Sequence, residues 1–459
     1  MRLLAWLGVS VVIVGLAVAF VLITGMSPAY DAYGWLVWGH QTLRSSLNLN
    51  SAPSWKPLPF LFTLPYSLLG KQTAFWLWVY TAVTAAFAAP VFAGRCAYWL
   101  VCAPGARRWP ALVAAVAAGA GVLGILGYWH FILIAYADPM MVALALAAID
   151  CHLCGRRRAA WVMVVLLALG RPEAWPLGAL YGVWTWRTMP SMRRFVMGGA
   201  LIVPLLWVGV SRLASPYWLV SSHIDRLSTA SFHLHGSHLT SVLDGYFSLY
   251  EFPVQIAALC ALALAIVRRD RRALWLFAAA AAWLSADIAL ALHGEVPTPR
   301  YMFEAAAVEV TLIGAGVGWI LASRPRPAVL RWLGAAAAVA LVAVMVPNIR
   351  FRGRLVHNGI RLGRTWTKVI KRLSLVIAHD GGTRAIVACG TPVTSVPFQS
   401  ILAWELGLNV RQIGWVPQQW ISSGQPVVLF INHYAGWQVR TYHTNGSACG
   451  ELVRDTSAN

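Results

Sequence analysis

The sequence predicts a mainly α-helical bundle that crosses a membrane many times and ends in a small α/β domain. Of 459 residues, 59% are hydrophobic and only 11% are charged, whereas a soluble domain has about 25% charged residues. Apolar runs long enough to cross a bilayer recur along the first 347 residues. Shorter runs typical of strands follow near the end of the chain.

The apolar runs predict about eleven membrane crossings. The first run lacks a small-residue cleavage pattern after Met26 and is interpreted as a retained anchor. The crossings are expected near residues 3–25, 75–94, 110–127, 139–154, a pair within 159–186, 195–213, 252–267, 273–292, 303–323 and 329–347.

The net charge of +20 would suggest nucleic acid as a partner of a soluble protein. In a multi-pass membrane protein it favours basic cytoplasmic loops and affinity for anionic lipids, so we expect membrane lipids and no nucleic acid as partners. Five short loops carry arginine clusters and are expected on the cytoplasmic side: Arg107–Arg108, Arg156–Arg158, Arg193–Arg194, Arg268–Arg272 and Arg324–Arg326.

This orientation places the loop after the first span, the loop 214–250 and the carboxy-terminal tail outside the cytoplasm. The segment 350–372 is rich in Lys and Arg and opposes that placement. Long translocated segments escape the charge rule, so an outward tail is favoured and a cytoplasmic tail is the alternative.

The segment 159–186 is basic on both flanks, so both of its ends are expected in the cytoplasm. Two full crossings need about 40 residues, and only 28 are present. We therefore expect a turn inside the membrane at Gly170–Glu173, with Arg171 and Glu173 on the wall of a cavity. An isolated Arg171–Glu173 ion pair and a single tilted crossing are the alternatives.

The first outward loop contains Asp31, a carboxylate at the membrane surface and therefore a candidate catalytic base. Apolar residues at helical spacing after it predict a helix that lies in the membrane interface. Capping of that helix is the alternative role for Asp31. The same loop carries His40, Trp55 and Lys56.

Arg300 and Tyr301 stand at the outward end of a predicted span. The guanidinium fork and the helix amino terminus both suit phosphate recognition. An arginine that reaches lipid headgroups is the alternative. Asp138, which directly precedes Pro139, is interpreted as a helix cap without a chemical role.

The sequence contains no GxGxxG fingerprint, Walker lysine or GxSxG elbow, which removes a soluble nucleotide as the obvious donor or fuel. Four histidines crowd the loop 214–250, but their spacing fits no compact zinc site. We therefore expect an acceptor-facing loop and assign no metal ligand there: His223, His233, His235 and His238.

The chain divides into a transmembrane body at 1–347, a basic linker at 348–378 and an α/β domain at 379–459. Strands are predicted at 385–388, 427–431 and 437–442, and a helix at 400–406. Cys389 and Cys449 both fall in this domain, and export would permit them to form a disulfide.

With these features in place, the chain resembles the GT-C class of glycosyltransferases, which take a sugar from a polyprenyl-phosphate carrier. The resemblance covers most of 1–347 in architecture. Its motifs are Asp31 just after the first span, Trp55–Pro59, Gly170–Pro176 and Pro299–Tyr301, which are similar to runs in members of the class from high-G+C bacteria. Many members carry a second acidic residue beside the first, where this chain has Ala32, so divalent-metal dependence stays open.

The resemblance implies an inverting transfer of mannose or arabinofuranose to a lipid- or polysaccharide-linked acceptor at the outer face of the cytoplasmic membrane. Asp31 would be the general base, the polyprenyl-phosphate sugar the donor, and no separate cofactor would be required. Contacts to donor phosphate or substrate are expected from Arg300, Arg171, Glu173, Lys56, His40, Trp55 and Tyr301. A transporter or flippase for a lipid-linked saccharide is the alternative function, and a non-catalytic scaffold is a further one.

Overall fold

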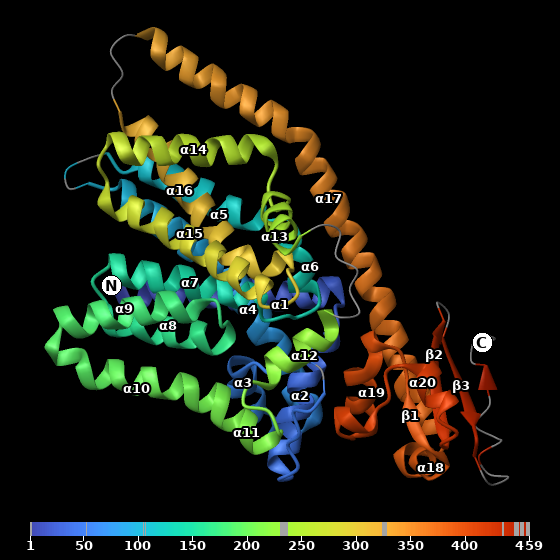
Figure 1. The fold of residues 1–459 in the computed structure, drawn as a ribbon. Coiled ribbons are helices and arrows are strands. Elements are labelled where there is room, and N and C mark those ends of the chain that lie inside the picture. The colour runs from blue at the N-terminus through green and yellow to red at the C-terminus, as the bar shows by residue number, and fades with distance from the viewer. Residues whose placement is uncertain are drawn as a thin grey trace.

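A computed structural model of the protein describes residues 2–51, 53–103, 105, 107–229, 237–323, 328–433, 436–444, 449 and 454–455. His233 and His235 of the predicted acceptor-facing loop lie outside the described residues. Within the described ranges the chain is overwhelmingly helical, which confirms the predicted fold class (Figure 1).

Helices occupy each of the predicted crossings. Five helices in the described part of the chain are long and apolar enough to span a membrane, and α13 with α14, bent by 89°, supplies a sixth candidate. The protein is therefore a multi-pass membrane protein. The helices of the body are α1 (Arg2–Thr24), α4 (Lys71–Val101), α5 (Trp109–Leu123), α7 (Asp138–Leu153), α8 (Arg157–Gly170), α9 (Ala174–Thr188), η1 (Pro190–Met192), α10 (Arg193–Pro204), η2 (Leu205–Gly209), α11 (Val210–Ala214), α14 (Phe252–Val267), α15 (Arg271–Leu292), η3 (Pro299–Met302), α16 (Phe303–Ala322) and α17 (Ala328–His379).

Small residues allow these helices to approach one another closely. A Cβ atom on Gly314 of α16 would lie 2.7 Å from the Ala114 carbonyl oxygen of α5, and one on Gly94 of α4 would lie 2.8 Å from that of Ala115. Close backbone contact of this kind is typical of helix packing in membranes, where lipid tails are as apolar as the side chains.

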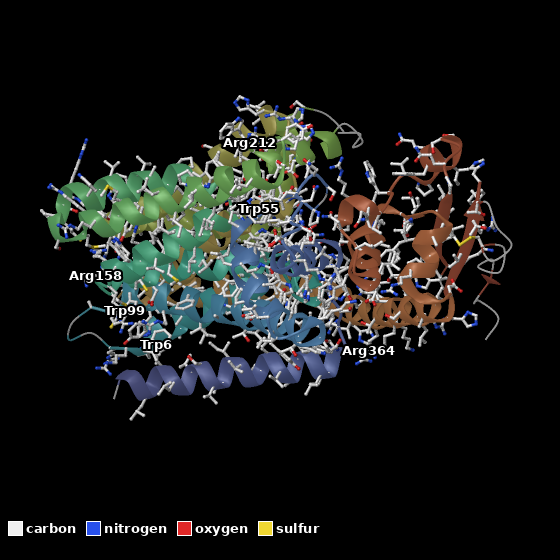
Figure 2. All side chains as sticks on the ribbon, turned by 90° about the horizontal axis from the view of Figure 1, so that it is seen from below. Trp6, Trp55, Trp99, Arg158, Arg212 and Arg364 are labelled. Carbon is white, nitrogen blue, oxygen red and sulfur yellow. A yellow bond between two sulfur atoms is a disulfide. The ribbon has the colours of Figure 1, made fainter. Side chains whose placement is uncertain are left out.

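The two ends of the bundle carry different parts of the chain. Figure 2 places Arg158 at the same end as Trp6 and Trp99, whereas Arg364 lies at the other end beside the C-terminal domain. The arginine-rich loop before α8 and the C-terminal domain therefore lie at opposite ends of the body. The sequence predicts these two segments on opposite sides of the membrane, and the arrangement agrees with that prediction.

The loops that the sequence predicts on the outward side, and the segment after α5, fold into short helices. They are α2 (Tyr30–Leu43) and α3 (Pro57–Ser67) in the first loop, α6 (Tyr128–Leu133), and α12 (Val220–Thr229) and α13 (His238–Phe247) in the loop 214–250. α2 is buried on most of its surface, and Trp35 and Trp38 are completely enclosed. A Cβ atom on Gly39 would lie 2.6 Å from the Thr63 carbonyl oxygen, so glycine at this position permits α2 and α3 to pack.

The single helix α17 leads from the body to the C-terminal domain (Figure 1). It passes without interruption through residue 347, so the three-part division of the chain stays a prediction. The domain contains α18 (Gly382–Cys389), β1 (Thr391–Val393), η4 (Val396–Phe398), α19 (Gln399–Leu406), η5 (Val410–Gln412), α20 (Pro417–Ser422), β2 (Val427–His433), β3 (Gly436–Tyr442) and β4 (Arg454–Asp455). Its sheet has the order β1-β2-β3-β4, with β1 parallel to β2 and the other pairs antiparallel.

The predictions of a helix at 400–406 and of strands at 427–431 and 437–442 are confirmed. The prediction of a strand at 385–388 is wrong, because these residues form the middle of α18. An apolar run of four residues fits one turn of a helix as well as a short strand, so local periodicity does not separate the two. Here Ile386 and Cys389, three residues apart, are the buried face of the helix.

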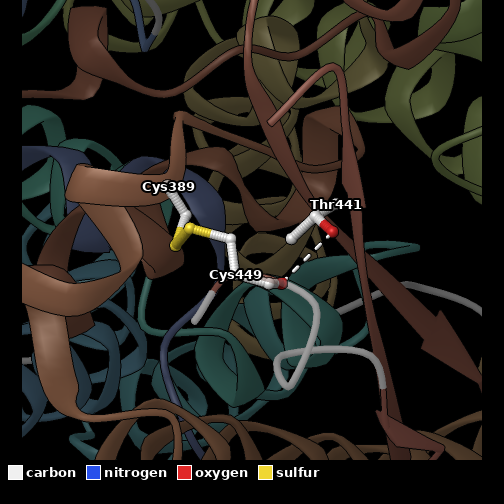
Figure 3. The surroundings of a disulfide bond; sticks show 3 residues. All are labelled: Cys389, Thr441 and Cys449. Carbon is white, nitrogen blue, oxygen red and sulfur yellow. Dashed lines mark hydrogen bonds between the residues drawn. A yellow bond between two sulfur atoms is a disulfide. The ribbon is translucent and has the colours of Figure 1, made fainter. Parts of the chain in front are cut away.

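A disulfide joins Cys389 at the end of α18 to Cys449 beyond β3 (Figure 3). The two Cα atoms lie 5.6 Å apart, and the Thr441 hydroxyl donates a hydrogen bond to the Cys449 carbonyl oxygen at 3.4 Å. Disulfides persist in oxidising compartments, so this bond supports an outward-facing domain.

We expect a cysteine introduced at Ser422 to react with a membrane-impermeant maleimide in intact cells. Ser422 is exposed at the end of α20 in the C-terminal domain. A cysteine at the exposed Arg158, at the other end of the body, should react only after lysis. The reverse pattern of labelling would show that the predicted orientation is wrong.

Candidate active site

Charged side chains from distant parts of the sequence meet where α2, α7 and α16 approach the break between α8 and α9. Asp31 lies in the first turn of α2, and Arg300 lies in η3 directly before α16. Arg300 Nη1 donates to Asp31 Oδ2 at 3.4 Å. The side chains of Arg300 and Asp31 are 20% and 14% exposed, so this pair is the accessible end of the cluster.

Behind this pair the charges continue into the protein. Arg300 Nε lies 3.9 Å from Asp138 Oδ1, Arg171 Nη2 donates to the same oxygen at 2.5 Å, and Arg171 Nε lies 3.5 Å from Glu304 Oε1. The side chains of Asp138, Arg171 and Glu304 are at most 2% exposed. We call Asp31, Arg300, Asp138, Arg171 and Glu304 the charge ladder, because carboxylates and guanidinium groups alternate along it.

The local backbone explains how Arg171 reaches the ladder. α8 ends at Gly170, and Arg171 adopts an extended conformation (φ −144°, ψ 120°) that directs the chain away from the helix axis. A Cβ atom on Gly170 would lie 2.2 Å from Met141 Sδ of α7, so glycine permits α8 to end against α7. The Arg171 guanidinium also donates to the Arg300 carbonyl oxygen at 3.1 Å, which ties the α8–α9 break to η3.

Aromatic rings hold the cations in place. The Tyr301 ring lies 4.5 Å from Arg171 Cζ, 5.2 Å from Arg300 Cζ and 5.8 Å from Lys56 Nζ. Cation–π contacts of this kind contribute about 0.5–2 kcal/mol each. Tyr301 therefore contacts three cations, one of which, Arg300, pairs with Asp31.

Tyr136 fixes the start of α2. Its hydroxyl oxygen accepts the Asp31 backbone N–H at 3.4 Å, and its ring lies 5.5 Å from Arg300 Cζ. Burial, together with the nearby Asp31 carboxylate, raises the pKa of Tyr136 well above its ordinary value. The group therefore remains a neutral phenol beside the Asp31–Arg300 pair.

Lys56 and Asp225 border the site on the side of the loop 214–250. Burial lowers the pKa of the Lys56 amine, although the neighbouring Asp138 carboxylate opposes this effect. Burial also raises the pKa of Asp225, which accepts a hydrogen bond from the Ser54 hydroxyl at 2.5 Å. The pKa of Glu295, in the loop after α15, is raised to about 7 by burial.

The other predicted site residues lie apart from the ladder. Trp55 packs against Trp38 and Phe60, with ring centroids 5.3 and 5.0 Å away, and its indole N–H donates to the Leu206 carbonyl oxygen. Trp55 thus anchors the first loop, and Figure 2 shows it in the interior of the body. His40, at the opposite end of α2 from Asp31, lies against Trp404 of the C-terminal domain with ring centroids 5.1 Å apart.

The predicted break between α8 and α9 is present, and its two charged residues have separate surroundings. Arg171 pairs with Asp138 and Glu304 as described above. Glu173 is buried and borders a small pocket together with Asp287 and Glu295. Within the described residues, Arg171 forms ion pairs with Asp138 and Glu304. The alternative, an isolated ion pair between Arg171 and Glu173, does not form in the described structure.

Sequence reasoning missed Asp138, Glu304 and Tyr136. The interpretation of Asp138 as a helix cap needs correction, because Ala137 occupies the cap position and Asp138 Oδ1 contacts Arg171 and Arg300. The capping alternative for Asp31 has the same difficulty, since Ala29 is the cap residue of α2. The signal that could have found Asp138 and Glu304 is a carboxylate within or beside an apolar span, which is costly unless it is paired.

No family model and no curated protein sequence matches this chain. Among solved structures, the chain is similar to ArnT from Cupriavidus metallidurans bound to undecaprenyl phosphate, with a TM-score of 0.51 and 16% sequence identity over 92% of this chain and 93% of that one. The apo state of the same protein gives a TM-score of 0.47 at 16% identity, over 93% of each chain. The chain therefore shares its fold with ArnT over nearly its whole length, which confirms the GT-C architecture that the sequence resemblance implies.

Proposed function

We propose that this protein transfers a sugar from a polyprenyl-phosphate donor to a lipid- or polysaccharide-linked acceptor at the outer face of the cytoplasmic membrane. The observation that carries the proposal is the accessible Asp31–Arg300 pair, which sets a proton acceptor beside a guanidinium suited to phosphate. The shared fold supports it, because the ArnT structure holds undecaprenyl phosphate. Mannose and arabinofuranose are the proposed donor sugars.

In the proposed step, the acceptor hydroxyl oxygen bonds to the anomeric carbon of the donor sugar. The bond between that carbon and the phosphate oxygen breaks, and its electron pair leaves with the polyprenyl phosphate. Asp31 takes the hydroxyl proton as the new bond forms. Direct displacement inverts the configuration at the anomeric carbon, and the donor supplies the energy without a separate cofactor.

Arg300 is placed to contact the Asp31 carboxylate and a donor phosphate at the same time. One nitrogen, Nη1, faces Asp31, and Nη2 donates to the Tyr301 hydroxyl at 3.4 Å. A guanidinium has five N–H donors, so contact with Asp31 leaves donors for a phosphate. Lys56 adds a second cation, whose Nζ lies 5.8 Å from the centre of the Tyr301 ring.

We assign Arg171 a positioning role instead of the direct phosphate contact that the sequence suggested. Its side chain is only 2% exposed and is occupied by Asp138, Glu304 and the Arg300 carbonyl oxygen. Its hydrogen bond to the Arg300 carbonyl oxygen holds the backbone of η3 and thereby positions the Arg300 guanidinium.

The proposal is tested with the purified full chain in lipid nanodiscs, supplied with polyprenyl-phosphate mannose or polyprenyl-phosphate arabinofuranose and a glycolipid acceptor. The expected result is release of polyprenyl phosphate together with a glycosylated acceptor. If neither donor is consumed while proteoliposomes move a lipid-linked saccharide between leaflets, the protein is a transporter and the proposal is wrong.

We expect Arg300→Lys to lower the use of the donor by about ten- to a hundredfold. A single ammonium does not reproduce the paired contacts of a guanidinium, and a hydrogen bond to a charged group contributes about 1.5–3 kcal/mol. Titration of the donor measures the effect. Arg212→Lys is the matched control, because Arg212 is exposed and contacts the Trp218 ring. Unchanged affinity and rate in Arg300→Lys would remove Arg300 from the site.

A further inference from the structure

A cleft of about 380 Å³ opens where the end of α2 and the start of α4 meet the C-terminal domain. Its volume falls within the roughly 300–1,000 Å³ that is usual for small-molecule sites. The lining includes His40, Gln41, Arg44, Lys71, Trp404 and Arg411.

The charge of this cleft has one sign. Among the described residues that line it are three cations, Arg44, Lys71 and Arg411, and no carboxylate. Lys71 Nζ lies 5.0 Å from the centre of the Trp404 ring and donates to the Glu405 carbonyl oxygen at 3.4 Å. Walls that carry one sign of charge concentrate the field in a cleft, so an anionic ligand is favoured.

The cleft also offers hydrogen bonds that the protein itself does not use. Gln41 Nε2 and His40 Nε2 are buried and have no hydrogen-bond partner within the described structure, although both residues line the cleft. Buried polar atoms without a partner are uncommon in folded proteins, so these two nitrogens are available to a ligand in the cleft. Burial and the nearby Arg44 and Lys71 lower the pKa of His40, so its ring is neutral at pH 7 and can donate or accept.

Carboxamides complete the lining. Gln41, Asn48, Asn409 and Gln412 each carry a side-chain amide that presents both donors and acceptors. Groups of this kind complement hydroxyl-rich molecules, which also donate and accept. The four amide oxygens already accept backbone N–H groups, so the amide N–H groups, Gln41 Nε2 above all, are what the cleft offers to the hydroxyl oxygens of a ligand.

The cleft is separate from the charge ladder. Asp31 and His40 are nine residues apart on α2, or about two and a half turns, so their side chains leave opposite sides of the helix. The start of α2 is also fixed to the C-terminal domain: Tyr30 donates to Gln399 Oε1 at 3.2 Å, and Ser400 donates to the Tyr30 carbonyl oxygen at 2.5 Å. The two sites therefore share a helix but not a face.

We propose that this cleft binds an acidic saccharide, with Arg44, Lys71 and Arg411 contacting its anionic group and His40 and Gln41 contacting its hydroxyl groups. The site goes beyond the proposed transfer reaction and does not depend on it, because binding requires neither Asp31 nor a lipid-linked donor. It assigns His40 to a second site on the outward face of the molecule.

Calorimetric titration of the full chain in phosphatidylcholine nanodiscs with digalacturonate tests the proposal. We expect binding by the native protein, weaker binding of neutral maltose, and a tenfold or greater loss of digalacturonate affinity in the double variant Arg44→Gln/Arg411→Gln. Both arginines are exposed, so the fold should tolerate their replacement. Arg440→Gln is the matched control, since it removes an exposed cation of the same domain that does not line the cleft.

Three results would overturn the proposal. They are digalacturonate affinity that is unchanged in the double variant, inorganic phosphate binding as tightly as digalacturonate, and binding of phosphatidylglycerol nanodiscs without any binding of digalacturonate. The second result would indicate a simple anion site, and the third a lipid headgroup site. Because the readout is binding, failure of the transfer assay leaves this test intact.

Discussion

Asp31→Asn is expected to abolish sugar transfer while leaving the fold and donor binding nearly intact. The amide keeps the shape of the carboxylate and can still accept from Arg300 Nη1, but it does not take a proton at neutral pH. Proton transfer by a positioned side chain contributes about 10²- to 10⁴-fold to a rate. Arg300 keeps a carboxylate partner after the change, because Asp138 Oδ1 lies 3.9 Å from Arg300 Nε.

Turnover and donor affinity are measured together in the same nanodisc preparation. We expect turnover to fall by about 10²- to 10⁴-fold and donor affinity to change little. Asp244→Asn is the matched control, because Asp244 is an exposed carboxylate on α13 and should tolerate the change. Near-normal turnover in Asp31→Asn would leave Asp31 only a structural role as a partner of Arg300.

The bundle and the accessible end of the site could be predicted because both depend on simple local signals. Apolar runs define spans wherever a bilayer is the solvent. Asp31 and Arg300 stand out because charged groups at the ends of such runs are costly unless they are solvated, paired or functional. These two residues are 269 positions apart, and their predicted placement at the same end of the bundle was enough to suggest that they meet.

The buried half of the ladder was not predictable from local signals. Asp138 precedes a proline at a helix start, so capping explained it fully. Its actual partner, Arg171, is 33 residues away and directly follows Gly170, where α8 ends against α7. Such a contact depends on how three helices pack, which the spacing of residues in the sequence does not encode.

Sequence proximity was misleading for His40 and Trp55. Both lie in the same short loop region as Asp31, but helical geometry turns His40 toward the C-terminal domain, and Trp55 packs into the core between Trp38 and Phe60. A position in the same loop therefore does not by itself indicate a shared site.

Arg171→Met is expected to destabilise the protein by about 3–5 kcal/mol, the usual effect of removing one partner from a buried ion pair. The change leaves Asp138 and Glu304, each 1% exposed, without the guanidinium that lies between them. The loss is read from unfolding of the purified protein in detergent. In Arg272→Met, where the Arg272 side chain is 60% exposed, the same measurement should change by less than about 1 kcal/mol.

The triple variant Arg171→Met/Asp138→Asn/Glu304→Gln separates charge from packing in this prediction. Neutral amides no longer require a buried cation, so the triple variant should recover a large part of the stability that Arg171→Met loses. If Arg171→Met unfolds like the native protein, the ladder is not a buried charge network. If the triple variant is no more stable than Arg171→Met, the guanidinium acts mainly by filling space beside Tyr301. If the triple variant recovers stability but not sugar transfer, the buried charges also position Arg300. The reason would be that Arg171 donates a hydrogen bond to the Arg300 carbonyl oxygen at 3.1 Å.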